Sequence, residues 1–242
     1  LSANQYATMY AYLHKLGIEL INDPTQYKHC HHLPENYPLI RDHSAQTEVL
    51  HIGTWDGLPF SSLSLADIQI LERFAGKPVI LKDDVKSEKG YWKEACFISD
   101  SSDFPNVLNT INKFLKLRGN RFTGNLVFRE YLELDASGVE PKSGRPLTDE
   151  YRLWILKGST FLTTKYSAGQ IPKVRSVNKF GWTPETGLKV EFGHAISAIK
   201  SNFFVMDFAC LKSGEWVILE CGDGQVSGLP ADLDPAVFYR TL

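Results

Sequence analysis

The sequence predicts an α+β fold. Strand-like apolar runs gather in the second half of the chain, and segments with helical spacing are interspersed with strands along its length. Short turns at Lys157-Gly158 and at Lys212-Ser213-Gly214 predict two antiparallel hairpins. The segment 135–150 is rich in Gly, Pro and Ser, and we expect it to be a surface loop.

Individual elements follow from local patterns. Residues 64–75 begin with a capping-box pattern, in which Ser64 is followed by Asp67, and they end before Gly76 and Pro78. The predicted helices are 4–16, 64–75, the segment between Asp103 and Gly119, and 183–200. The predicted strands are 78–82, 124–134, 151–158, 159–166, 202–211 and 215–221.

Composition excludes several classes of protein. The chain carries 26 basic and 28 acidic residues, so it lacks the excess of basic residues that is typical of nucleic-acid-binding proteins. No apolar run approaches the roughly 18 residues that a membrane helix needs. The four cysteines are not spaced as in a disulfide framework, and we expect them to be buried free thiols in a cytoplasmic protein. Because Leu1 is not a start methionine, we expect the natural chain to begin earlier.

The last predicted hairpin carries two acids that we expect to face each other on neighbouring strands. If Lys212 to Glu215 form a four-residue loop, Leu211 faces Trp216, and Asp207 then faces Glu220. Two carboxylates at that separation suit Mg²⁺, which usually takes one or two carboxylates and completes its shell with phosphates and water. A three-residue loop would instead place the acids on opposite faces. The alternative is a pair of solvated acids at sheet edges.

Basic residues also end or interrupt strands. Lys82 closes the run "PVILK", and Lys86 lies in the charged loop that follows, which is either a cradle for phosphate oxygens or a solvated turn. In "NLVFREYLEL" the alternation breaks at Arg129-Glu130. This break suits either a segment that holds a purine ring edge-on or an edge strand with outward charges. Arg152 and Lys165 lie in successive strands, so pairing across the Gly158 turn would aim both cations at one place.

The order of these motifs resembles the ATP-grasp superfamily over about residues 77–230. The chain looks most similar to the clade named for two arginines and a lysine, and the closing hairpin "MDFACLKSGEWVILECGDGQ" is the most specific part. In that superfamily, two α+β subdomains with antiparallel sheets grip ATP. The resemblance implies subdomains at 51–128 and 129–242, with 1–50 as the remnant of an upstream region.

Carried over by position, the resemblance also implies roles for individual residues. They are Lys82 for the phosphates, Glu130, Tyr131 and Leu132 for adenine, Glu133 for ribose, Arg152 and Lys165 for the transferred phosphate, and Asp207 and Glu220 for Mg²⁺. Lys86, in the charged loop after Lys82, is a further candidate for the phosphates. One departure concerns the position two residues after the second acid, where the superfamily usually has asparagine and this chain has Gly222. Asp223 is therefore a further candidate metal ligand. A second departure is that the loop after Lys82 holds only Gly90 where the superfamily's flap is rich in glycine.

The resemblance implies a function with two cofactors, ATP and Mg²⁺. Most members of the superfamily join a carboxylate to an amine through an acyl phosphate, so we expect an ADP-forming ligase acting on small-molecule or peptide substrates. One alternative is a nucleotide-binding module without ligase turnover, for which Gly222 is the sequence argument. The other is a hydrolase that uses Asp207 and Glu220 as an acid/base pair, since retaining glycosidases hold their carboxyls about 5 Å apart. The hydrolase leaves the basic residues without a role. The sequence identifies neither the acyl donor nor the amine.

Overall fold

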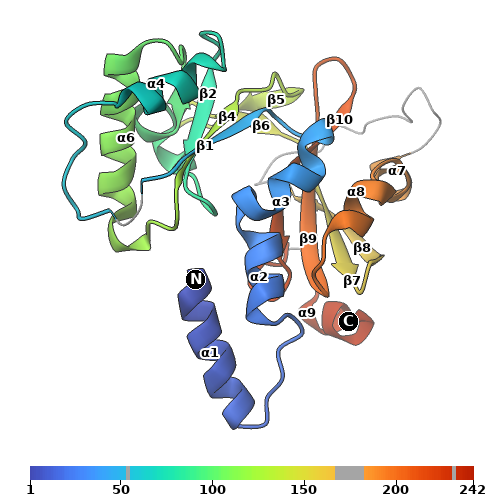
Figure 1. The fold of residues 1–242 in the computed structure, drawn as a ribbon. Helices are drawn as coiled ribbons and strands as arrows, with labels where there is room; N and C mark the ends of the chain where they lie inside the picture. The colour runs from blue at the N-terminus through green and yellow to red at the C-terminus, as the bar shows by residue number, and fades with distance from the viewer. Residues whose placement is uncertain (53–54, 167–182, 231–232) are drawn as a thin grey trace. The chain divides into compact units, whose positions relative to one another are not determined.

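The structure is a computed structural model that describes residues 1–52, 55–166, 183–230 and 233–242. It divides into two compact units, each with its own sheet (Figure 1). Each unit also has its own apolar core. Unit 1 comprises 1–44, 134–137 and 148–242, and unit 2 comprises 45–133 and 138–147. The predicted divisions lay at 50/51 and 128/129. In the structure the first 44 residues belong to unit 1, and the first stretch of unit 2 runs from 45 to 133. The mixed α+β fold with antiparallel sheets is confirmed.

Unit 1 is built on a four-stranded antiparallel sheet with the order β10-β9-β7-β8. Its strands are β7 (Glu150–Leu156), β8 (Ser159–Tyr166), β9 (Phe203–Cys210) and β10 (Trp216–Asp223). Its helices are α1 (Ala3–Lys15), α2 (Pro24–His31), α3 (Leu33–Ile40), α7 (Pro184–Glu191), α8 (Gly193–Ala198) and α9 (Pro235–Thr241), with the 3-10 turn η1 (Arg41–His43). Both predicted hairpins are present, as β7–β8 and as β9–β10.

The two faces of this sheet bury different sets of side chains. One face packs against α2, α3, α7 and α8, which contribute residues such as Cys30, Ile40, Leu188 and Ile196 to the larger core (Figure 1). On the opposite face, a smaller cluster joins Trp154 of β7 to Phe238 of α9, whose ring centroids are 4.7 Å apart. The predicted helix 183–200 is therefore two helices, α7 and α8, which meet at Phe192 and Gly193.

The N-terminal segment is tied to unit 1 by a buried polar side chain. Asn22 pairs with the backbone of Phe203 as a neighbouring strand would, because its Nδ2 donates to the carbonyl at 2.6 Å and its Oδ1 accepts from the N–H at 2.9 Å. The rings of Tyr6 in α1 and Tyr27 in α2 stack with centroids 3.8 Å apart, and neither side chain reaches solvent. The first 44 residues are thus an integral part of this unit.

Unit 2 has a second four-stranded antiparallel sheet, ordered β1-β4-β2-β3. Its strands are β1 (Thr47–Leu50), β2 (Val79–Lys82), β3 (Phe97–Ile98) and β4 (Leu126–Glu130), and its helices are α4 (Leu65–Glu72), α5 (Trp92–Ala95) and α6 (Phe104–Arg118), with 3-10 turns η2 (Lys89–Tyr91) and η3 (Gly119–Arg121). The apolar stripe of α6 packs on one face of the sheet. The segment 135–150 is not a plain loop, since β5 (Ala136–Val139) pairs with β6 (Pro146–Thr148).

A close backbone approach joins the start of β4 to the loop after β2. Gly124 has φ +76°, and a Cβ placed there would lie 1.8 Å from Oδ2 of Asp84, a carboxylate that is almost fully buried. The same carboxylate accepts hydrogen bonds from the N–H of Asn125 at 3.1 Å and from its Nδ2 at 3.0 Å. Only glycine leaves room for this arrangement.

We therefore expect Gly124→Ala to destabilise unit 2 more than Gly57→Ala, its matched control. Gly57 also has a positive φ, +89°, but nothing lies within 4 Å of its added Cβ. Both changes carry the conformational cost of a left-handed residue, about 1 to 2 kcal/mol. Gly124→Ala adds the cost of displacing Asp84, about 1 to 3 kcal/mol for an overpacked site. Urea denaturation measures both, and equal losses would contradict the steric argument.

Candidate functional site

Four polar side chains form a row across the sheet of unit 1. Thr164 in β8 pairs with Arg152 in β7, which pairs with Asp207 in β9, which in turn pairs with Glu220 in β10. Directly paired residues point to the same face of a sheet, so all four side chains share one face. This is the face that also carries Trp154 and α9. We call these four residues the polar row.

The predicted pairing of Asp207 with Glu220 is confirmed, although it arises in another way. The turn is one residue longer than predicted, because Trp216 pairs with Cys210 and not with Leu211. A β-bulge then inserts Leu219 between Ile218 and Glu220 and shifts the register back by one residue. If Leu219 instead paired regularly with Asp207, Glu220 would lie opposite Met206 and point into the larger core.

Arg152 and Asp207 form a buried, bidentate ion pair. The Nε and Nη2 atoms of Arg152 each donate to a different carboxylate oxygen of Asp207, both at 2.7 Å. The two residues are only 8% and 3% exposed, so water screens the pair little. The Nη1 atom of Arg152 donates to the carbonyl of Gly228 at 3.2 Å, and its guanidinium lies 5.7 Å from the ring of Trp154. The guanidinium therefore has an acid, a backbone carbonyl and an aromatic ring among its contacts.

The expectation that Lys165 joins Arg152 is wrong in this structure. A second β-bulge, at Phe161 in β8, shifts the register, so that Lys165 pairs with Tyr151 and Arg152 pairs with Thr164. Lys165 consequently lies on the opposite face, where its Nζ is 3.0 Å from a carboxylate oxygen of Asp149. Its ammonium also lies 5.7 Å from the ring of Tyr151. The structure does not bring the two predicted cations together.

Asp223 likewise occupies a different place from the acid pair. It follows Glu220 by three positions on a regular stretch of β10, so its side chain points to the opposite face. Its carboxylate is fully buried and accepts from Asn22 at 2.6 Å and from the N–H groups of Gln225 at 2.8 Å and Val226 at 3.2 Å. Burial raises the pKa of this carboxyl above its ordinary value, against the lowering effect of these hydrogen bonds. Asp223 shapes the turn after β10, whereas Gly222 remains on the face of the polar row.

In unit 2, Lys82 is held at the end of β2 with only 5% of its surface exposed. It alternates with Val79 and Leu81 of the core, and so it points to the face that α6 does not cover. Lys82 and Lys89 both lie close enough to the Cys96 thiol to act on it electrostatically. Burial dominates nevertheless and raises the pKa of that thiol to about 12. The predicted phosphate lysine is thus rigidly placed, while Lys86 is exposed in the loop that follows.

An aromatic cluster lies at the end of β4 in the same unit. The ring of Tyr131 meets Phe97 and Trp92 edge-on at 5.1 and 6.3 Å, and Trp92 stacks on Phe97 at 5.5 Å. Glu130, the first residue of the predicted adenine segment, accepts an ion pair from Lys77 at 2.8 Å. The segment ends with Leu132, and Glu133 is exposed at the last residue before the chain enters unit 1. Flat apolar rings near a buried lysine suit a base with attached phosphates.

The loop after Lys82 is fixed by a residue that the sequence interpretation missed. Arg118 donates to the buried Asp83 carboxylate at 2.9 Å, and Asp83 also accepts from the N–H groups of Val85 at 2.8 Å and Lys86 at 2.6 Å. A signal for this role exists, because Arg118 continues the inward stripe of α6. An arginine at a core position of an amphipathic helix points to a buried acid elsewhere.

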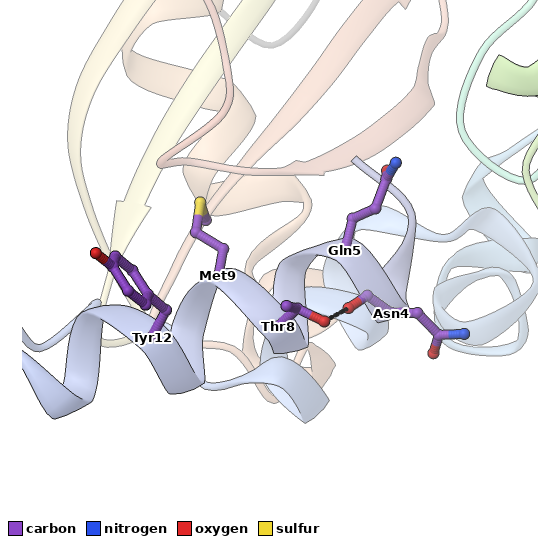
Figure 2. A pocket seen from close by; sticks show the side chains of 5 residues that line it. All are labelled: Asn4, Gln5, Thr8, Met9 and Tyr12. Atoms are coloured by element: carbon purple, nitrogen blue, oxygen red, sulfur yellow. Dashed lines mark hydrogen bonds between the residues drawn. The ribbon is translucent and has the colours of Figure 1, made fainter.

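Other features of the described residues add little to the site. No group of three or more His, Cys, Asp or Glu among them has the arrangement of a metal centre. No helix in the described ranges is long and apolar enough to cross a membrane. All four cysteines are buried and free, as predicted. A hollow of about 540 Å³ lies along α1 and is lined by Asn4, Gln5, Thr8, Met9 and Tyr12 (Figure 2), none of which is a predicted site residue.

The chain belongs to a known family of ATP-grasp domains. Residues 74–242, most of the chain, match family 3 of the ATP-grasp clade that is named for two arginines and a lysine. No curated protein sequence matches. The resemblance inferred from the closing hairpin is therefore confirmed.

Solved structures share the fold at low sequence identity. The D-alanine–D-alanine ligase from Bacillus anthracis, solved with ATP, aligns with a TM-score of 0.56 and 16% identity over 97% of this chain and 70% of that one. The corresponding ligase from Coxiella burnetii gives 0.55 and 11% over 98% and 60%. C-terminally truncated Cdc123 from Schizosaccharomyces pombe gives 0.53 and 12% over 91% and 93%. At these identities the matches establish an ATP-grasp-like fold alone.

The ion pair of the polar row makes a prediction about stability. Asp207→Leu leaves the buried guanidinium of Arg152 without its carboxylate, and breaking a buried pair in this way costs about 3 to 5 kcal/mol. The double change Arg152→Met with Asp207→Leu removes both charges and should recover most of that loss. Chemical denaturation of the two variants and the parent provides the measurement. A double variant no more stable than Asp207→Leu would show that the pair is not the source of the effect.

Proposed function

We propose that the protein is an ATP- and Mg²⁺-dependent ligase that joins a carboxylate to an amine through an acyl phosphate. Membership of the ATP-grasp family supports the use of a nucleotide. The observation that carries the proposal is the pairing of Asp207 with Glu220 on neighbouring strands, beside the guanidinium of Arg152. Two acids and a cation on one face match the charge pattern that phosphoryl transfer requires.

The donor set on this face fits Mg²⁺. Two carboxylates are a usual protein contribution to a Mg²⁺ site, and substrate phosphates and water complete its shell. In the proposal Asp207 and Glu220 hold the metal, which neutralises phosphate charge when it is bound. Asp223 is assigned to the turn after β10, because its carboxylate already accepts three hydrogen bonds on the other face. Gly222 contributes no side-chain oxygen to the polar row.

Unit 2 is proposed to contribute the contacts to the nucleotide. The ammonium of Lys82 binds phosphate oxygens, with Lys86 as a second and more mobile contact from an exposed position. The backbone of 130–132 and the ring of Tyr131 bind adenine, and Glu133 binds ribose. Because Lys82 is buried at a strand end, its position costs little to organise when the nucleotide binds.

The proposed reaction has two steps. A carboxylate oxygen of the acyl donor attacks the γ-phosphorus, and the bond to the leaving ADP oxygen breaks. The amine nitrogen then attacks the acyl carbon, phosphate leaves, and the nitrogen loses a proton. Arg152 stabilises the negative charge on the transferred group, which is the electrostatic work that such sites perform. Lys165 takes no part in this scheme, since it lies on the opposite face of the sheet.

Nucleotide binding by Lys82 is testable through thermal stability. Ligand present at 100 times its dissociation constant stabilises a protein by about 2.7 kcal/mol. We expect MgATP to raise the melting temperature of the parent, and Lys82→Met to remove most of that rise. Lys89→Ala should keep it, because Lys89 is exposed on the turn η2. Equal losses in both variants would show that the loop meets the phosphates, and no shift in the parent would oppose nucleotide binding altogether.

The ligase activity itself predicts that hydroxylamine traps an acyl phosphate. The protein is incubated with MgATP, hydroxylamine and pools of amino acids and small peptides, and ADP and hydroxamate are measured together. We expect both products in one pool and neither without an acid, because cations stabilise charge in the transition state but do not make water a good nucleophile. Glu220→Gln should lower both rates at least about 10-fold, since it removes a metal charge at constant shape.

Three outcomes would argue against the ligase. AMP as the product, or phosphate release that is indifferent to every acid, would contradict an ADP-forming carboxylate–amine ligase. MgATP stabilisation without ADP or hydroxamate in any pool would favour the nucleotide-binding module. The absence of an oxygen ligand at Gly222 is the observation that favours that alternative.

A further inference from the structure

The ligand-free protein already has a cation at the carboxylate that is proposed to bind metal. Arg152 takes both oxygens of Asp207 with two bonds of 2.7 Å, and both residues are almost fully buried. A planar guanidinium that fits a carboxylate in this bidentate way is among the strongest pairings in proteins. A free divalent ion that approaches Asp207 therefore meets a positive charge that is already in place.

The guanidinium of Arg152 has partners other than Asp207 on the same face of the sheet. Its Nη1 atom contacts the Gly228 carbonyl, and its guanidinium lies 5.7 Å from the ring of Trp154, so it has contacts besides Asp207 on the same face. A polyphosphate offers a guanidinium a bidentate partner of the same geometry as a carboxylate. Arg152 can therefore exchange Asp207 for phosphate without a loss of pairing.

We propose that Arg152, besides acting on the transferred phosphate, keeps free divalent cations off Asp207 and Glu220 until a polyphosphate draws its guanidinium away. Asp207 and Glu220 would then hold a metal that is bound to the nucleotide, because release of Arg152 frees the carboxylate of Asp207 in the same step. This inference rests on the proposed function for the identity of the polyphosphate. The exclusion of free metal depends only on the polar row, and it is tested without nucleotide.

The test measures binding of Mn²⁺ alone, as a stand-in for Mg²⁺, by the electron paramagnetic resonance signal of the free ion. The full chain is titrated at pH 7 without nucleotide. We expect the parent to show no saturable site below millimolar Mn²⁺, and Arg152→Met to bind at least about 10-fold more tightly. Arg152→Gln removes the charge but keeps a hydrogen-bonding amide. It should give the same gain and provides a second variant if Arg152→Met fails to fold.

Two further variants locate the gained site. Lys165→Met removes a cation from the opposite face of the same sheet, and it should leave Mn²⁺ binding unchanged. Arg152→Gln combined with Glu220→Gln should lose the gain, because one of the two paired acids is then neutral. Mn²⁺ should also raise the melting temperature of the Arg152 variants and leave that of the parent unchanged.

Several results would overturn the inference. They are micromolar Mn²⁺ binding by the parent, no gain in either Arg152 variant, or an equal gain in Lys165→Met. Failure of the ligase assay would leave these metal titrations unaffected, so the two proposals fail separately. A parent that yields hydroxamate but also binds free Mn²⁺ tightly would retain the proposed function and lose this inference.

Discussion

The register of the sheet in unit 1 is the constraint on which the polar row depends. Side chains alternate between faces with a period of two, so one extra residue in a strand moves every following side chain to the other face. The bulge at Leu219 places Glu220 beside Asp207, and the bulge at Phe161 removes Lys165 from the face of Arg152. Two inserted residues thus decide which charges meet. The same sequence paired without the bulges would bring other side chains together, so the bulges and not the residue types alone set this arrangement.

Each unit buries an arginine together with an aspartate. The Arg152–Asp207 pair in unit 1 and the Arg118–Asp83 pair in unit 2 each join an arginine to an acid within hydrogen-bonding distance and away from solvent. Such pairs add little net stability compared with an apolar replacement, but they specify geometry, since an unpaired buried charge is costly. In unit 2 the pair fixes the loop after Lys82, and in unit 1 it fixes the middle of the polar row.

Local sequence patterns predicted much of the fold, but they could not predict features that depend on long-range contacts. The helices near 4–16 and 104–118 and both hairpins follow from periodicity and turn residues, and all are present. The prolines between residues 24 and 38 concealed α2 and α3. Strand β1 is only four residues long and depends on partners in β4 about 80 positions away. The opposition of Asp207 and Glu220 was predicted from a four-residue turn, but it arises from a longer turn and a bulge that offset each other. Bulges leave no mark in a hydrophobic pattern, so neither this route nor the place of Lys165 was predictable.

The pairing of Asn22 with Phe203 has a consequence for the order of folding. The contact joins positions 181 residues apart, and unit 1 is assembled from the first 44 residues and from segments near the end of the chain. Contacts of such high sequence separation form slowly, because closure of a long loop precedes them. During synthesis unit 2 emerges as one nearly continuous stretch, while α1 and α2 wait for β9. Until then the cysteine of α2 lacks the core into which it packs, and exposed apolar surface of this kind is prone to aggregation.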